Sequence, residues 1–211
     1  MNEALVQLIT EKVIEVLNND ISSSKGEVKV GVSARHVHLS KKDLEILFGE
    51  GYELRVKKYL MGEQFASEEV VTIVGPKLRA IEKVRILGPV RSSTQVEISA
   101  TDAITLGVKA PVRLSGDTKG SAPITIVGPR GTIKIEEGCI VAKRHIHMHP
   151  DDSKRLGIRE GIVSVKVKGD RAGILENVDV RVREDFNFEM HIDTDEANAL
   201  GIRNGDLVEI V

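Results

Sequence analysis

The chain has few aromatic residues and almost no cysteine. Its 211 residues include no Trp, two Tyr, four Phe and a single cysteine, Cys139. One cysteine excludes an internal disulfide and suits a protein of the reducing cytosol. Because so few rings are available, we do not expect stacking on aromatic side chains to be the main way in which this chain would hold a nucleotide.

Neither sign of charge dominates, and long apolar runs are absent. Lys and Arg number 30 against 32 Asp and Glu, which gives a net charge of −2. This balance argues against a nucleic-acid binder driven by bulk charge, but not against a local cationic pocket. No apolar run approaches the roughly 20 residues of a membrane span. Charged residues also interrupt the apolar positions near the N-terminus, so we expect no signal peptide.

Residues 1–19 are predicted to form an amphipathic helix. Apolar residues recur there at steps of three and four, with polar residues opposite them, and a polar linker follows up to residue 26. A lone helix of this length is marginal in water, so its apolar stripe should dock. It can dock on the body of this protein or a copy of it, or it can be a targeting helix for another protein.

From residue 27 onward the chain changes to short β-branched runs separated by Gly and Pro. Strands at this spacing, without long helices between them, are typical of β-barrels and sandwiches and not of a doubly wound sheet. The predicted strands cover residues 28–32, 70–74, 84–87, 123–127, 132–135 and 163–167. Short helices are predicted over residues 41–48, 102–106, 150–156 and 195–200, each starting near an Asp, Ser or Thr.

The chain repeats itself. Residues 32–39 match residues 141–148 at an offset of 109, and residues 97–108 match residues 191–202 at an offset of 94. Two copies indicate a duplicated domain and not a solenoid. We therefore predict a mainly β fold with two pseudo-symmetric β-barrel domains and short capping helices, after an N-terminal helix and linker (1–26). The first half would span residues 27–140 and the second residues 141–211, with strands shared across the boundary.

The six histidines of the chain are clustered. They fall in three places, at His36 and His38, at His145, His147 and His149, and at His191. Strand residues separated by one point to the same face, so each His-x-His pair can share one metal ion at Zn–N distances of about 2.0–2.1 Å. The repeat then offers a third candidate ligand at one matching later position, Glu97 in the first half and His191 in the second.

A two-metal site accounts for both copies. A single His-x-His pair is weak evidence, but two copies that each have a third ligand position are much stronger. Three protein ligands leave a fourth position for substrate, and zinc fits His and carboxylate ligands best. The predicted ligands are His36, His38 and Glu97 for one ion and His145, His147 and His191 for the other. His149, whose repeat partner is Ser40, is interpreted as a neighbour of a helix cap or a group behind the ligands.

Three arginines lie close to these motifs in the sequence. Arg35 and Arg144 each precede a His-x-His pair directly, and a structural ion pair is the default role for both. Arg91 follows a Gly-Pro-Val stretch and lies six residues before Glu97, which suits bidentate binding of phosphate or carboxylate, although a loop arginine is usually solvated. Cys139 is interpreted as a buried structural thiol rather than a nucleophile. Motifs of serine hydrolases, P-loop proteins and Rossmann folds are absent.

Three segments, residues 33–40, 88–99 and 143–148, closely resemble the phosphate propanoyltransferase family. These are zinc-dependent phosphotransacylases associated with propanediol-using bacterial microcompartments, and the similarity runs from about Val28 to the C-terminus. The resemblance implies two β-barrels built from an interleaved chain, with coenzyme A bound between them. It implies two zinc ions on the ligand sets given above and a phosphate-binding role for Arg91. Coenzyme A contacts are implied at Ser33, Lys58 and Arg85.

The reaction implied by the resemblance is acyl-CoA (propanoyl- or acetyl-CoA) plus phosphate giving acyl phosphate plus coenzyme A, reversibly. Our hypothesis is direct attack by phosphate without a protein nucleophile. Two alternatives stay open: a two-zinc hydrolase of a small amide or phosphate ester, and a non-catalytic zinc-stabilised scaffold protein. The resemblance suggests a cytoplasmic protein, free or inside a bacterial microcompartment, with residues 1–19 as a candidate contact for a shell protein. Association into a homo-oligomer is also left open.

Overall fold

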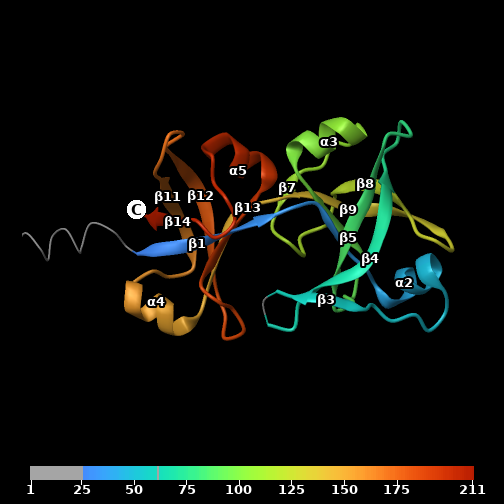
Figure 1. Ribbon diagram of the computed structural model, residues 1–211, viewed down its shortest axis with the longest axis horizontal. Helices are drawn as coiled ribbons and strands as arrows, with labels where there is room; N and C mark the ends of the chain where they lie inside the picture. The colour runs from blue at the N-terminus through green and yellow to red at the C-terminus, as the bar shows by residue number, and fades with distance from the viewer. Residues whose placement is uncertain (1–25, 61) are drawn as a thin grey trace, which may run out of the picture.

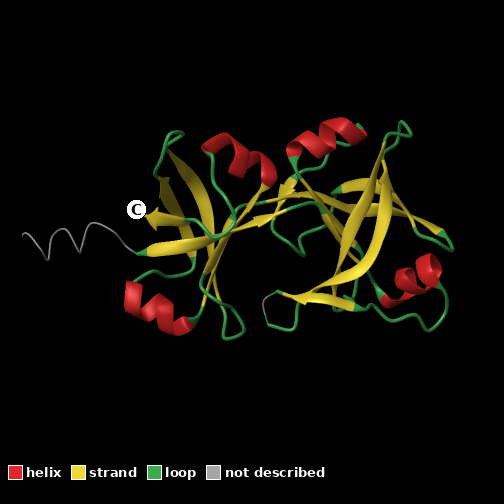
Figure 2. Ribbon diagram, in the orientation of Figure 1, coloured by secondary structure: helices red, strands yellow, loops and turns green. Residues whose placement is uncertain are grey.

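The computed structural model describes residues 26–60 and 62–211, and the helix expected over residues 1–19 lies outside them. Two β-rich bodies lie side by side and are connected by extended strands (Figure 1). Each body contains a closed ring of six paired strands, and four short helices lie around them (Figure 2). The prediction of a mainly β fold with two barrels and short capping helices is confirmed.

The first barrel is closed by pairing in the order β4-β5-β2-β6-β9-β8 and back to β4. Its strands are β2 (His36–His38), β4 (Phe65–Val74), β5 (Ala80–Gly88), β6 (Gln95–Ile98), β8 (Ala122–Val127) and β9 (Thr132–Ala142). Two more strands pair at its edges, β3 (Val56–Tyr59) with β4 and β7 (Val112–Arg113) with β9. The helices α2 (Lys41–Phe48) and α3 (Ala100–Leu106) accompany this barrel.

The second barrel is closed in the order β1-β13-β10-β12-β11-β14. Its strands are β1 (Glu27–Ser33), β10 (His145–Met148), β11 (Gly161–Val167), β12 (Gly173–Val182), β13 (Glu189–Asp193) and β14 (Leu207–Ile210). The helices α4 (Pro150–Leu156) and α5 (Thr194–Leu200) accompany it. Each barrel encloses its own apolar core, so the molecule has two cores, as expected of a duplicated domain.

The two halves of the chain exchange their leading strands. At the repeat offset of 109, β1 corresponds to the end of β9. Nevertheless β1 pairs with β13 in the second barrel, while β9 pairs with β6 in the first, and both pairings are parallel. Each crossing strand is followed, after two residues, by the His-x-His strand of the other barrel. The exchange therefore brings both His-x-His strands close to the place where the barrels meet.

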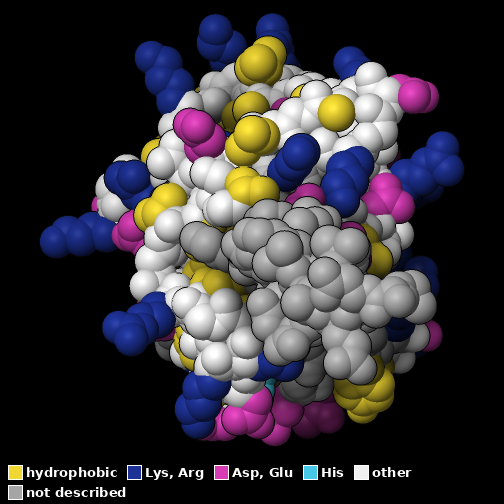
Figure 3. Space-filling model, turned by 90° about the vertical axis from the view of Figure 1, so that its left-hand side faces the viewer, with side chains coloured by type: hydrophobic (Ala, Val, Ile, Leu, Met, Phe, Trp, Pro, Cys, Tyr) yellow, Lys and Arg dark blue, Asp and Glu magenta, His cyan; other side chains and the backbone are white. Residues whose placement is uncertain are grey.

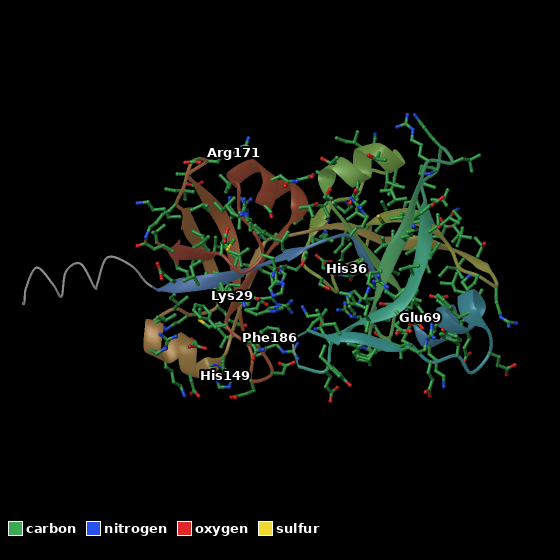
Figure 4. All side chains as sticks on the ribbon, viewed as in Figure 1. Lys29, His36, Glu69, His149, Arg171 and Phe186 are labelled. Atoms are coloured by element: carbon green, nitrogen blue, oxygen red, sulfur yellow. The ribbon has the colours of Figure 1, made fainter. Side chains whose placement is uncertain are left out.

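The histidine side chains face away from the barrel cores. Val37 and Ile146, the middle residues of the two pairs, belong to the cores of the first and second barrels respectively. Because strand side chains alternate, the histidines on either side of them point outward. They are still covered, since His38 is only 2% exposed and His147 only 8%. Figure 4 shows His36 between the two barrels, so the outward faces of β2 and β10 form part of the interface.

The predicted local elements are mostly present. All four short helices form, and their αL glycine or extended cap residues mark their ends. The strands β3, β6, β7, β12, β13 and β14 were not among the predicted strands. In β12, Glu176 and Asn177 interrupt the apolar pattern, and Asn177 has a positive φ of 54° in the structure. Pairing with β11 and β10 nevertheless holds this segment extended.

Charge is spread over the surface at the end formed by the second barrel. Figure 3 shows Lys and Arg side chains around the rim of this face, with Asp and Glu among them and gathered at the lower edge of the view. The described residues contain no helix with the length and apolarity that a bilayer crossing needs.

Candidate metal centre between the barrels

His36, His38 and Glu97 form a compact group of metal-ligand type. The strands β2 and β6 run antiparallel, which places His36 directly opposite Glu97. Glu97 Oε2 lies 3.5 Å from His36 Nε2, and Glu97 Oε1 lies 3.8 Å from His38 Nε2. The potential ligand atoms of the three residues all lie within 4.8 Å of one another. Since two ligand atoms about 2.1 Å from a tetrahedral ion are about 3.4 Å apart, the group is close to coordination geometry without the ion.

The protonation states of Glu97 and His38 in this first set also suit a metal. Burial would raise the pKa of the Glu97 carboxyl, but His36 and His38 hold it well below its ordinary value. Burial, followed by the charges of His36 and Arg91, lowers the pKa of His38 to about 3. Burial also acts to lower the pKa of His36, but the adjacent Glu97 outweighs it and the pKa is raised. An ionised carboxylate and a neutral imidazole are the forms that bind divalent metals.

His145, His147 and His191 gather at the matching position of the second barrel. His145 lies opposite His191 in the β10–β13 register, as His36 lies opposite Glu97. The three ring centroids are 4.6 to 5.2 Å apart. The rings of His145 and His191 stack nearly parallel, at 7°, and among the described residues only the first set brings three potential ligand atoms within 4.8 Å. The three rings of the second set thus lie close together, but their nitrogen atoms are not all within 4.8 Å of one another.

The second set is held in its neutral form. Burial lowers the pKa of all three histidines; together with repulsion from His145, it lowers the pKa of His147 to about 2 and that of His191 to about 4. The ring atoms His38 Nδ1, His147 Nδ1 and His191 Nε2 are buried without a hydrogen-bond partner. Buried nitrogens of this kind are costly unless something binds them. Neutral, unpaired imidazoles in both sets therefore fit a divalent metal.

The two sets are oriented by the same backbone contact. His36 Nδ1 lies 2.9 Å from the carbonyl oxygen of Ala34, and His145 Nδ1 lies 2.9 Å from that of Lys143. In each ring this contact directs Nε2 away from the crossing segment. The negative charge of Glu97 reaches His145 and His191, where it acts to raise their pKa values and so opposes the larger effect of burial. The two sets therefore lie within electrostatic range of each other across the interface.

Arg91 is a half-buried neighbour of the first set. Its Nη1 donates to Ser115 Oγ at 3.0 Å. Ser115 Oγ also accepts from Gln95 Nε2 at 3.0 Å, and that amide donates to Glu97 Oε1 at 2.6 Å. Burial lowers the pKa of Arg91, while Glu97 acts to raise it. Arg91 is thus linked to the set instead of being solvated in its loop. No sequence motif marked Ser115.

The three residues expected to contact coenzyme A lie in different surroundings. Ser33 ends β1 opposite Asp193, on the outward side that β1 shares with His191. Arg85 lies beside His36 in the β2–β5 pairing, and its Nη1 donates to the carbonyl oxygens of Ser67 and Glu68 at 3.0 and 2.8 Å. Lys58 is exposed on the edge strand β3. The fold therefore brings Ser33 and Arg85 beside the two groups of candidate ligands, whereas Lys58 lies exposed on an edge strand.

The expected ion pairs of Arg35 and Arg144 are confirmed. Both residues lie in the two-residue segments that cross between the barrels, not on a strand. Arg35 Nη2 lies 2.8 Å from Asp102 Oδ1, and Arg144 Nη1 lies 2.6 Å from Glu196 Oε1. Asp102 and Glu196 are the capping-box residues of α3 and α5, at the repeat offset of 94. Each crossing segment is thus anchored to a helix of the barrel it enters.

Cys139 and His149 have structural roles, as expected. Cys139 is fully buried, and burial raises the pKa of its thiol to about 12. A thiol that stays protonated and shielded cannot act as a nucleophile. His149 is the N-cap of α4, where its Nδ1 accepts from the Asp151 amide at 3.2 Å. It takes the place that Ser40 has at the N-cap of α2.

A family comparison agrees with this geometry. The profile of the family described as phosphate propanoyltransferase matches residues 29–203. The chain belongs to this family. The phosphate propanoyltransferase of Lachnoclostridium phytofermentans is 58% identical over the full length of both chains. That of Thermotoga maritima is 60% identical over 86% of this chain and 88% of the relative, and that of Rhodobacter capsulatus is 48% identical over 96% of each. The expected enzyme class, an acyltransferase of the phosphotransacylase type, is confirmed.

Proposed function

We propose that the protein transfers an acyl group between coenzyme A and phosphate, reversibly, with propanoyl- or acetyl-CoA as the acyl-CoA. The observation that carries this proposal is the buried group of His36, His38 and Glu97 with Arg91 linked to it, at the interface of two barrels. Relatives named phosphate propanoyltransferase cover the whole chain, which supports the same substrates here. The products are acyl phosphate and free coenzyme A.

Two zinc ions are proposed as cofactors, one on each set. His36, His38 and Glu97 would hold the first ion, and His145, His147 and His191 the second. The neutral imidazoles, the ionised carboxylate and the unpaired ring nitrogens support this assignment. When bound, zinc supplies a Lewis acid that stabilises the coenzyme A thiolate and the charge of phosphate.

The residues of the chain would position phosphate for direct attack on the thioester. Arg91 presents a planar guanidinium that suits two phosphate oxygens, and Ser115 fixes one of its nitrogens. A phosphate oxygen forms a bond to the acyl carbon, the carbon–sulfur bond breaks, and coenzyme A leaves as the thiolate. Holding both substrates together removes much of the entropic cost of their encounter. No protein nucleophile takes part, in agreement with the buried state of Cys139.

Coenzyme A is proposed to bind along the interface, with contacts from Ser33, Arg85 and Lys58. The outward faces of β1 and β5 carry the first two, and β3 extends the same region toward solvent. Location inside a bacterial microcompartment, with residues 1–19 contacting a shell protein, is proposed from the family resemblance. Deleting residues 1–19 and measuring association with shell proteins tests it; unchanged association contradicts it.

A thiol-release assay with metal analysis tests the proposed reaction. We expect about two zinc ions per chain and release of free thiol from propanoyl- or acetyl-CoA only when phosphate is present. Thiol release without phosphate would indicate the hydrolase alternative, and bound zinc without turnover would indicate the scaffold alternative. An acyl group trapped on the protein would contradict direct attack by phosphate.

A further inference from the structure

The N-terminal cap of helix α2 is completed by a residue of another segment. Ser40 is the N-cap and Asp43 the third residue of the helix, and the Ser40 hydroxyl accepts from the Asp43 amide at 3.1 Å. In a capping box, the amide of the N-cap donates to the side chain of the third residue. In α2 the Ser40 amide donates instead to the hydroxyl oxygen of Thr94 at 2.9 Å, and this hydroxyl donates to Asp43 Oδ2 at 2.5 Å. The Thr94 hydroxyl is thus inserted between the two partners.

The helices α3 and α5 close their capping boxes directly. In α3 the Ser99 amide donates to Asp102 Oδ2 at 3.3 Å. In α5 the Asp193 amide donates to Glu196 Oε2, also at 3.3 Å. Both boxes are therefore made by residues of one helix and its own cap. A helix of this fold needs no inserted hydroxyl to be capped, so the link from Thr94 to α2 has to be explained by something other than the helix.

The repeat shows which half of the chain carries this link. Position 94 corresponds to Phe188 at the offset of 94, and α2 corresponds to α4 at the offset of 109. Phe188 has no hydroxyl and packs against the core of the second barrel. Asp152, the third residue of α4, pairs with an arginine of its own helix. Within the described residues, the link therefore belongs to the half whose loop carries Arg91, and the half with Asp185 at that position lacks it.

The link fixes the segment that carries Arg91 to the chain that follows β2. The carbonyl oxygen of Leu39, the residue directly after His38, accepts from the Arg91 amide at 2.8 Å. An isolated parallel bridge pairs Arg91 with Ser40. Three residues later, the Thr94 hydroxyl completes the cap of α2. The segment is thus attached at both of its ends to the residues that connect the His-x-His strand with α2.

We propose that Thr94 and Asp43 are positioning residues, which hold the segment of Arg91 against α2 so that its guanidinium stays beside the first set. Ser115 fixes one nitrogen of Arg91, but where this long side chain can reach depends on where its backbone lies. Thr94 is only 7% exposed, so loss of its hydroxyl would leave the Ser40 amide without its acceptor in a covered place. This inference rests on the proposed function, because it takes Arg91 as the phosphate-binding residue.

Kinetics of matched variants test the assignment. Thr94→Val keeps the shape of the side chain and removes the hydroxyl, whereas Thr94→Ser keeps the hydroxyl. Asp43→Asn replaces the accepting carboxylate with an amide. Asp152→Asn is the control, because Asp152 has the same position in α4 but pairs with the exposed Arg155. Initial rates of thiol release give KM for phosphate and for acyl-CoA separately, zinc content is measured after gel filtration, and amide hydrogen exchange reports local opening at Arg91.

We expect Thr94→Val to raise KM for phosphate and to lower kcat/KM for phosphate by about 10–100-fold, because a small displacement of a positioning group is enough for such a loss. KM for acyl-CoA and the zinc content should stay those of the wild type, and the Arg91 amide should exchange faster. Thr94→Ser should recover most of the loss. Asp43→Asn should show the same split between the substrates to a lesser extent, and Asp152→Asn should behave as the wild type.

Unchanged phosphate kinetics in folded Thr94→Val, or equal losses for both substrates, would overturn the assignment. If Thr94→Val does not fold, Asp43→Asn takes its place, and wild-type phosphate kinetics in that variant would overturn it. Failure of the proposed function is a different result, namely a wild-type protein that releases no thiol or releases it without phosphate. An unchanged exchange rate of the Arg91 amide in Thr94→Val would overturn the positioning role alone.

Discussion

The two barrels carry the same strands but hold their candidate ligands differently. In the first, the charge of Glu97 attracts His36 and raises its pKa, so the ligand atoms converge without a metal. In the second, His145 and His191 are neutral and lie with their rings stacked, so no such attraction draws their nitrogens together. The duplication therefore preserved the positions of the ligands. In the first set the carboxylate of Glu97 holds the ligand atoms close together before a metal binds.

The largest effect is expected from removing one ligand of each set. His36→Ala and His145→Ala should each lose one zinc ion and reduce kcat/KM by more than the roughly 10–100-fold typical of groups that only support a ligand. Metal content and phosphate-dependent thiol release check this. If either variant lost its ion and kept full activity, the two sets would not act in one reaction.

A smaller effect is expected when Arg91 is replaced, and almost none when the residue at the corresponding position of the second barrel is replaced. Arg91→Lys keeps a charge but loses the bidentate fork, so kcat/KM for phosphate should fall by about 10²–10³-fold, as when one stabilising donor is removed. The matching position in the second barrel is Asp185, an exposed residue paired with Arg183.

Asp185→Asn is the matched control and should leave phosphate kinetics nearly unchanged. Initial rates at varied phosphate and fixed acyl-CoA distinguish the two variants. Equal losses in both would show that Arg91 acts through general surface charge and not as a specific phosphate contact.

The pH dependence of stability should also differ between the two sets in the metal-free protein. Burial lowers the pKa of His191 from the ordinary 6.5 to about 4 in the folded protein, so the unfolded chain binds more protons between these two pH values. Stability should thus fall with decreasing pH in this window, by up to about 1.4 kcal/mol per pH unit for each such histidine. The raised pKa of His36 acts oppositely, since its contribution is present at low pH and is lost as pH rises through its folded pKa.

Urea unfolding of the chelated protein at pH 7 and pH 5 measures this. His191→Gln should flatten the loss of stability on acidification, and His36→Gln should steepen it. A wild-type protein equally stable at both values would contradict neutral burial of the second set.

The smallest effects are expected in the two cores. Cys139 in the first barrel and Val30 in the second are equivalent by the repeat, and both are fully buried. Cys139→Ala should cost about 1 kcal/mol and Val30→Ala roughly 2 kcal/mol, because both lose buried side-chain volume. Thermal unfolding measures the losses, and turnover of the folded Cys139→Ala protein should equal that of the wild type. A strong loss of turnover would restore Cys139 as a nucleophile.

Local patterns were sufficient for most of the elements. The helices over residues 41–48 and 150–156 follow directly from the caps Ser40 and His149 and the glycines after them. The strands β3, β6, β7, β12, β13 and β14 and the serine at position 115 were missed. Short strands, a strand interrupted by Glu176 and Asn177, and a loop without a motif leave little local signal.

The sequence alone determined the candidate ligand positions and the enzyme family, because alternation along a strand and the two repeat offsets are local properties of the chain. Only the tertiary structure decided that β1 and β9 change places and that both sets consequently face one interface. Strand pairing between remote segments depends on the register of both partners, which neither segment encodes by itself.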